Sequence, residues 1–386
     1  MIRSATIAYT AAAIVISSIT LPIYAYAQDA STTSGTTYVE QAIVTQIVSD
    51  TPTIGVMSTP QTYTEVVMAR IVSGAESGNT VQFSTSYVPG DGQRVSVDDR
   101  MYIARYSNVT STSTTASYFY QSIDHYRIPA LILFLVLFLG CVVFIGGKQG
   151  IRGLVALVGG ICLIIFVLLP GAIHGYSPLL LSVIIASLIA SVGAYITHGF
   201  NKMTTAAGIG MVLTIIVSTL FASLAVHIGY LSGVTDENTY NLLSVPEYGA
   251  LNFQGLLLGG IIIGLLGVLY DAAIGQAVAV EELTRAAPNL SRKIIYGRAF
   301  RIGREHIGAL VNTLILAYVG TSLPIFISYY GYSLFSSTYY SPVINQEWFV
   351  TEVIRMSVGG IGLMLTIPIT TLVAVWMLVP RRDDTV

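Results

Sequence analysis

The sequence predicts a polytopic α-helical membrane protein with a small N-terminal β-rich domain. Seven apolar stretches lie between Ile128 and Val379, each about long enough to cross the ~30 Å hydrocarbon core of a bilayer as a helix. Of the 386 residues, 53% are hydrophobic and only 10% are charged. Because the charges are confined to the N-terminal third and to the gaps between apolar stretches, the bilayer is the main solvent for this chain.

Residues 1–27 have the pattern of a secretory signal peptide. Arg3 precedes an apolar run over residues 5–23, and the small residues of Ala25-Tyr26-Ala27 predict cleavage after Ala27. An uncleaved anchor is the alternative, because the run is long for a signal core. In both cases Arg3 stays inside and the following segment is exported, so only the helix count changes, from seven to eight.

Residues 28–106 predict a small extracytoplasmic β-barrel or β-sandwich. Thr, Ser, Val and Tyr dominate, and turn signals at 50–52 and 89–92 separate alternating or β-branched segments. The segment contains no metal-binding or catalytic cluster, so a purely structural role and a ligand-binding role fit it equally well. Residues 107–127 begin rich in Ser and Thr and are predicted to tether this domain to the first membrane helix. The predicted strands are 39–48, 65–72, 80–87, 94–97 and 101–106.

The predicted membrane domain covers residues 128–379, and its charges indicate an orientation. If residues 28–127 lie outside, every Lys and Arg in the loops, and those of the tail 380–386, lie on the cytoplasmic side. The loops of the other side carry acidic residues and many tyrosines. This positive-inside pattern with an outer aromatic belt predicts a multi-pass cell-membrane protein with a cytoplasmic C terminus. The predicted spans are 129–147, 151–170, 177–197, 204–231, 252–279, 306–330 and 355–379.

The sequence lacks recognisable catalytic and metal-binding motifs. The five histidines are too dispersed for a ligand spacing, and both cysteines fall inside predicted spans. Gly146-Gly147-Lys148 is not followed by the Ser or Thr of a phosphate loop. Residues 175–178 lack the second glycine of a nucleophile elbow. We therefore predict no enzymatic activity, no catalytic residue, no metal, no cofactor and no nucleic-acid partner.

Asp271 is the main functional candidate. It lies about eight residues, or ~12 Å, from the cytoplasmic end of the fifth predicted span, after glycines whose spacing favours close helix packing. An Asp at the bilayer centre costs roughly 2.5–3.5 kcal/mol, so it should face protein or water. Counting along the antiparallel sixth span places Asn312 and Thr313 at a similar depth. Asp271 either titrates or binds a cation with Gln276, Asn312 and Thr313 as neighbours, or forms a hydrogen bond that locks two helices.

Two further charged groups lie near predicted helix ends. Glu352 and Arg355, one helical turn apart, form either an interfacial ion pair or part of a site for an anion or carboxylate at the outer mouth. Basic residues three apart in the loop before the sixth span share one side of a helix. Contact with anionic lipids is their expected role, and substrate gating is the alternative. The basic candidates are Arg292, Lys293, Arg298, Arg301 and Arg304.

Three segments of the membrane domain carry a shared pattern. They are residues 297–320, which begin Gly-Arg-Ala-Phe-Arg-Ile-Gly-Arg-Glu, residues 270–283 around Asp271, and residues 352–370. With them the chain resembles the YibE/F-like family of multi-pass membrane proteins from about residue 37 to residue 379. The resemblance implies an exported β-rich module followed by about seven helices, and a permease role without an assigned reaction. Glu305 departs from the Asp that is common in the family.

Two functions fit these features. The first is a secondary transporter or permease for an unidentified ion or small solute, because Asp271, close glycine packing and the helix prolines Pro324 and Pro368 are typical of such proteins. The second is a non-transporting accessory or sensor protein whose exported β domain binds a partner. The first is favoured. Small-residue helix faces also permit a homo-oligomer.

Overall fold

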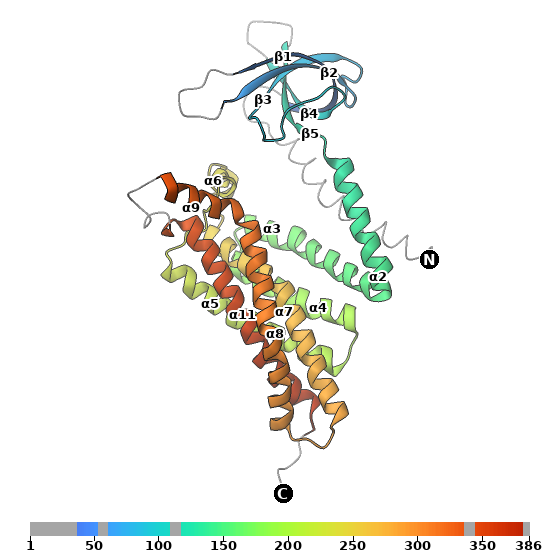
Figure 1. The fold of residues 1–386 in the computed structure, drawn as a ribbon, viewed down its shortest axis with the longest axis vertical. Coiled ribbons are helices and arrows are strands. Elements are labelled where there is room, and N and C mark those ends of the chain that lie inside the picture. The colour runs from blue at the N-terminus through green and yellow to red at the C-terminus, as the bar shows by residue number, and fades with distance from the viewer. Residues whose placement is uncertain (1–36, 53–60, 109–116, 336–343, 381–386) are drawn as a thin grey trace. The chain divides into compact units, whose positions relative to one another are not determined.

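A computed structural model describes residues 37–52, 61–108, 117–335 and 344–380. The predicted signal peptide and most of the C-terminal tail lie outside these described residues. The chain divides into two compact units, Met1–Ile145 and Gly146–Val386. The first contains a β-barrel and the beginning of a long helix, and the second contains a bundle of helices (Figure 1).

Five strands close into a barrel in the order β1-β2-β3-β5-β4. β1 pairs antiparallel with both β2 and β4, while β3 and β5 run parallel where the barrel closes. This strand order is that of the OB-type Greek-key barrel. Alternate residues such as Val44, Val67 and Ile103 are fully buried inside it. The strands are β1 (Thr37–Pro52), β2 (Tyr63–Ile71), β3 (Thr80–Tyr87), β4 (Arg100–Asn108) and β5 (Ser117–His125).

The barrel confirms the expected β-rich domain but corrects two predictions within it. Residues 94–97 were expected to form a strand and have no regular structure. Residues 107–127 were expected to form a tether, yet β5 occupies Ser117–His125 and only two residues separate it from the next helix. The prediction failed because the Ser/Thr-rich start of that segment obscured Tyr118-Phe119-Tyr120, a β-favouring run that begins the closing strand.

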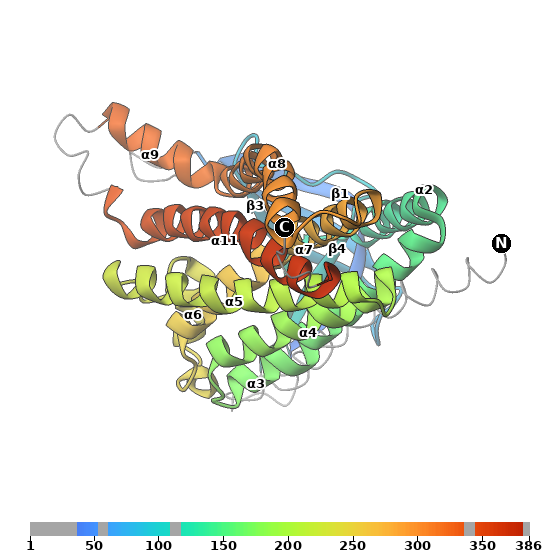
Figure 2. The same cartoon turned by 90° about the horizontal axis from the view of Figure 1, so that it is seen from below.

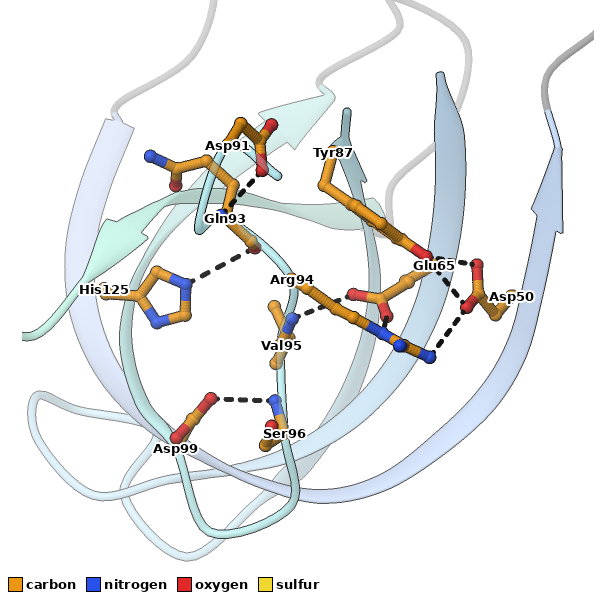
Figure 3. A network of polar contacts seen from close by, with 10 residues as sticks. All are labelled: Asp50, Glu65, Tyr87, Asp91, Gln93, Arg94, Val95, Ser96, Asp99 and His125. Carbon is orange, nitrogen blue, oxygen red and sulfur yellow. Dashed lines mark hydrogen bonds and ion pairs between the residues drawn. The ribbon is translucent and has the colours of Figure 1, made fainter. Parts of the chain in front are cut away.

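Residues 88–99 form an extended strap across the barrel, and a buried carboxylate anchors it (Figure 3). Glu65 is fully buried, and its Oε2 accepts a hydrogen bond from the Val95 backbone N–H at 3.1 Å. Arg94 forms ion pairs with Glu65 Oε1 at 3.6 Å and with Asp50 Oδ2 at 3.3 Å. Because a buried carboxylate is costly unless paired and hydrogen-bonded, the strap and Glu65 stabilise one another.

Asp91 fixes the turn that begins the strap. Its carboxylate accepts hydrogen bonds from the backbone N–H groups of Val88 at 2.7 Å and Gln93 at 2.8 Å. These two bonds hold the pKa of Asp91 below its ordinary value. Because the folded-state pKa of Asp91 is lowered, ionised Asp91 stabilises the folded state. This contribution to folding stability is complete above the unfolded-state pKa and is lost as the pH falls through the folded-state pKa.

We expect Glu65→Ala to loosen the strap. The substitution leaves the Val95 N–H without its acceptor and removes the buried partner of Arg94, at a cost of about 1–3 kcal/mol. In the full-length protein, hydrogen exchange of peptides covering residues 88–99 should then accelerate by roughly 5- to 150-fold. Gln82→Ala, on the exposed side of β3, is the matched control and should leave this exchange unchanged. Equal exchange in Glu65→Ala and the wild type would contradict the anchoring role.

The helical unit is built around α7, which packs against α4, α5, α8 and α11. Figure 2 shows α11 lying between α5 and α8. Leu257, Ile261, Leu265 and Leu269 of α7 are buried in the shared core. The principal helices are α4 (Pro178–His198), α5 (Lys202–Ile228), α7 (Phe253–Ala286), α8 (Arg292–Thr321) and α11 (Glu347–Leu378), and the shorter ones are α3 (Leu169–Ile173), α6 (Glu237–Leu243) and α9 (Leu323–Phe335).

In the described part of the chain, five helices are long and apolar enough to cross a membrane: Ile128–Ile173, α4, α5, α7 and α11. The first covers both predicted spans, 129–147 and 151–170, because two helices meet at a kink within α2 (Ile128–Leu163) and the next turns follow it directly. Within it, Gly147 has φ 53° and ψ −134°, which kinks the helix at the predicted boundary. The count of seven spans stays a prediction.

The predicted span 306–330 corresponds to two helices. α8 begins at Arg292, so the basic segment that was expected to lie in the loop before the sixth span is the first part of α8. α8 ends at Thr321, and α9 starts at Leu323 with Pro324 in its first turn. Proline has no N–H to donate and clashes with the preceding turn, so Pro324 favours the break between α8 and α9.

Candidate functional site

A buried polar cluster lies where α8 ends. We call Tyr318, Ser322, Glu352 and Arg355 the Glu352 cluster. The Ser322 hydroxyl donates to Glu352 Oε2 at 2.8 Å, and Arg355 Nη1 lies 3.1 Å from Glu352 Oε1. Glu352 is buried, whereas the Arg355 side chain is 30% exposed. The predicted spacing of Glu352 and Arg355 therefore produces an ion pair, and the structure adds Ser322 from the break after α8.

The ends of α8 and α11 position this cluster. The break at Pro324 leaves Ser322 as the C-cap of α8, with its N–H donating to Tyr318 O at 3.0 Å. The start of α11 is held by Glu347, whose Oε1 accepts hydrogen bonds from the backbone N–H groups of Ser232 at 2.6 Å and Gly233 at 2.9 Å. Gly233 has φ +86° and no room for a Cβ against Phe253 O, so glycine is required there.

Three buried polar groups around the cluster have no hydrogen-bond partner among the described residues. They are the Tyr318 hydroxyl, Arg355 Nε and Thr351 Oγ1. Both carboxylate oxygens of Glu352 already have partners, and the charges of Arg355 and Glu352 both act on the Tyr318 hydroxyl. Each unpaired buried donor costs about 1–3 kcal/mol. The cluster therefore has more hydrogen-bond donors than acceptors.

One side of α7 is exposed although much of the helix is buried. We call Gly260, Gly264, Gly267, Asp271 and Gly275 the α7 stripe. All five are exposed, and their spacing of three or four residues places them on one helix face. A Cβ added to Gly260, Gly267 or Gly275 would meet no atom within 4 Å. The Asp271 carboxylate thus lies in a line of glycines that leaves space beside it.

The neighbouring helices flank the α7 stripe. α4 contacts one side of α7, where Ser182 meets Gly259 and Gly193 lies against Tyr270. α8 contacts the other side, where Gln276 Nε2 donates to Ala299 O at 2.7 Å. The stripe lies between these two lines of contact on α7.

The α7 stripe leads to the Glu352 cluster. The Tyr318 hydroxyl lies 2.8 Å from the position of a Cβ on Gly264. Gly264 is seven residues, about 10 Å along the helix, from Asp271. Asp271, Gly267, Gly264 and Tyr318 therefore form a continuous line from an exposed carboxylate to a buried ion pair. Neither Tyr318 nor Ser322 was among the predicted site residues.

The residues predicted as neighbours of Asp271 form no hydrogen bond with it in the described part of the chain. Gln276 is buried and its bond to Ala299 O makes it the group that joins α7 to α8. Asn312 and Thr313 are exposed, and the Thr313 hydroxyl bonds within its own helix, to Ala309 O. Contacts of Gly264 with Tyr318 and of Gln276 with Gly303 place Asp271 level with about residues 308 to 311 of α8. Asn312 is therefore within about one turn, ~2–6 Å along the helix, of that level.

The basic residues at the start of α8 divide into two groups. Arg292 is not a free lipid-facing cation: its guanidinium donates to Val379 O at 2.9 Å and to Trp376 O at 3.1 Å, capping the end of α11. The other four are exposed and form no ion pair with the described residues: Lys293, Arg298, Arg301 and Arg304. Contact of these four with anionic lipids stays a prediction.

Both parts of this site lie in a region that matches a known protein family. A family model described as YibE/F-like protein matches residues 134–380, more than half of the chain. The matched region contains α7, α8 and α11, and so includes Asp271 and the Glu352 cluster. Comparisons with curated proteins and with solved structures find no match.

Proposed function

The chain belongs to the YibE/F-like family, and from that premise we propose that it is a secondary transporter or permease for an ion or small solute. The observation that carries the proposal is the line from Asp271 along the α7 stripe to the Glu352 cluster. Asp271 is the coupling or binding carboxylate in this proposal. The Glu352 cluster is the second binding position.

The physical chemistry of charges in membranes supports this assignment. Ionisable side chains within apolar helices are costly, and they commonly mark pathways for ions, protons or substrates. Glycines beside Asp271 leave room for water or a small solute, and the break between α8 and α9 resembles the discontinuous helices that form transporter binding sites. The interior Pro368 of α11 is a second weakened point in the bundle.

The proposed orientation follows from the basic residues. The exposed cations at the start of α8 lie on the cytoplasmic side, where they contact anionic lipids. The Glu352 cluster then lies toward the outer face and Asp271 closer to the cytoplasm. The β-barrel is extracytoplasmic and the C terminus cytoplasmic. In this proposal the path opens alternately to the outer side, at the Glu352 cluster, and to the cytoplasmic side, near Asp271.

A second proposal is a non-transporting accessory or sensor protein. It is favoured by exposed aromatic residues on the barrel: Phe119 is 50% exposed and stacks on Tyr106 with 4.8 Å between ring centroids. Tyr38 and Tyr118 are exposed and lie against the Arg105 guanidinium, with 4.6 and 4.9 Å from Cζ to the ring centroids. Aromatic surfaces of this kind are enriched in protein interfaces. A homo-oligomer is compatible with either proposal.

Charge movement in proteoliposomes tests the first proposal. Protein reconstituted on a solid-supported membrane is stepped through changes of pH, Na⁺, K⁺, Mg²⁺ and phosphate, with protein-free liposomes as the control. A protein-dependent current, or an electroneutral flux detected by an internal pH dye, supports transport. The lack of both in folded protein would favour the accessory role.

A further inference from the structure

We propose that the Glu352 cluster binds a small monovalent oxyanion, such as a carboxylate or dihydrogen phosphate, together with one proton. The inference rests on the proposed function and assigns its substrate class. The proton binds to the Glu352 carboxylate, and the oxyanion binds to the Arg355 guanidinium and the Tyr318 hydroxyl. No covalent bond is formed or broken except the bond to the transferred proton.

The hydrogen-bond inventory of the cluster favours an acceptor as its ligand. Both Glu352 oxygens have partners, in Ser322 and Arg355. The groups without partners, Arg355 Nε, the Tyr318 hydroxyl and the fully buried Thr351 hydroxyl, can all donate. Arg presents its N–H groups in a planar fork that matches the two oxygens of a carboxylate or phosphate. An oxyanion can accept a hydrogen bond from each of these groups, whereas a metal cation would leave the Arg355 Nε–H, which can only donate, without a partner.

Charge balance explains why a proton accompanies the anion. Ionised Glu352 and Arg355 together carry no net charge, so an added monovalent anion would leave one uncompensated negative charge in a poorly solvated site. Uncompensated buried charge is strongly disfavoured. Protonation of Glu352 removes one negative charge and frees the Arg355 guanidinium for the anion. The empty site and the site holding both ligands are then equally neutral.

The surrounding elements add few competing ionisable groups. Residues 253–269 of α7 contain no titratable side chain, and His227, near the end of α5, is exposed. α8 contributes Tyr318, and α9 contributes the exposed Tyr330. Glu347 of α11 is held by Ser232 and Gly233. Among the described residues, Glu352 is the carboxylate that lies beside Arg355.

Trp348 provides a reporter because it lies one helical turn before Glu352 on α11. Full-length Trp376→Phe protein in detergent, which retains Trp348 as its single tryptophan, is titrated with acetate or phosphate between pH 5 and 8. We expect a fluorescence change, uptake of about one proton per anion, and a Kd that rises about tenfold for each pH unit over which binding takes up one proton. Sulfate, which is divalent, should bind at least about tenfold more weakly.

Substitutions of Glu352 and of Arg355 separate binding of the proton from binding of the anion. Glu352→Gln should bind the anion without proton uptake and with a Kd independent of pH. Arg355→Gln should weaken binding by at least about tenfold, and Arg355→Lys should weaken it less. Lys293→Gln, an exposed basic residue of α8, is the matched control. Circular dichroism and gel filtration establish that each variant folds.

The possible outcomes distinguish this inference from the proposed function. Proton-linked anion binding in the wild type that loses its proton in Glu352→Gln supports the inference, even if proteoliposomes show no flux and the transport proposal fails. Wild-type pH dependence in Glu352→Gln would overturn the inference. So would the failure of acetate and phosphate to bind wild-type protein, even if flux of another solute upheld the transport proposal.

Discussion

Asp271→Asn abolishes the pH-driven current of proteoliposomes while the protein still folds; this is the largest functional effect that we expect. Asn has the size of Asp but cannot ionise, so a proton or cation loses its site. Asp271 is exposed on α7 and has no hydrogen bond or ion pair with the described residues, so little stability depends on it. Solid-supported membrane currents at equal protein density measure the effect, and loss below a tenth of the wild-type current is the expected result.

Glu282→Gln is the matched control for Asp271. Glu282 is an exposed carboxylate farther along α7, and its ion pair with Arg285 at 2.8 Å is on the surface. Exposed pairs contribute only about 0–1 kcal/mol. The control should retain the wild-type current. An undiminished current in Asp271→Asn would remove Asp271 from the mechanism, whereas loss of folded protein would support a structural lock.

Gly210→Val is expected to produce the largest loss of stability. Gly210 of α5 faces Thr370 of α11, and a Cβ on Gly210 would lie 3.0 Å from the Thr370 Cα. That contact is with backbone, so it cannot be relieved by rotating a side chain. Valine adds two further methyl groups, and overpacking of this kind costs about 1–3 kcal/mol or more. The midpoint of thermal unfolding in detergent should fall by several degrees.

Gly267→Ala is the matched control for Gly210→Val. Gly267 is also an interior helix residue, but no atom lies within 4 Å of the Cβ position. Alanine in an open helix position is favoured over glycine by roughly 0.5–1 kcal/mol. This variant should therefore be as stable as the wild type or slightly more stable. Equal destabilisation of both variants would contradict the close approach of α5 and α11.

The sequence could predict the helices and strands whose signals are local. Apolar runs predicted α4, α5 and α7 closely, and alternating patterns predicted β2 and β3. β5 was missed because a Ser/Thr-rich segment precedes it and because its barrel position also depends on pairing with β3, which ends 30 residues earlier. The break at Ser322 was missed because the apolar run continues through Pro324, so hydropathy alone joins α8 to α9.

The candidate site was predictable only where it depends on spacing along one helix. Glu352 and Arg355 are three residues apart, and that separation alone brings them together. Tyr318 and Ser322 join them through packing between α8 and α11, which no local pattern encodes. The depth of Asn312 was counted from a helix start near residue 306, whereas α8 begins at Arg292, and the contacts of α7 with α8 leave Asn312 within about one turn of the level of Asp271.

A transport path along the α7 stripe requires that water reaches the stripe, and cysteine labelling measures this access. In a Cys141→Ser, Cys162→Ser background, Gly267→Cys is exposed to a charged, membrane-impermeant thiol reagent after reconstitution. Leu372→Cys, at an apolar position of α11 that is 62% exposed, is the lipid-facing control. We expect labelling at position 267, slowed by the transported ion, and no labelling at position 372. If position 267 were as unreactive as position 372 in folded protein, the stripe would face lipid or another helix and would not form a transport path.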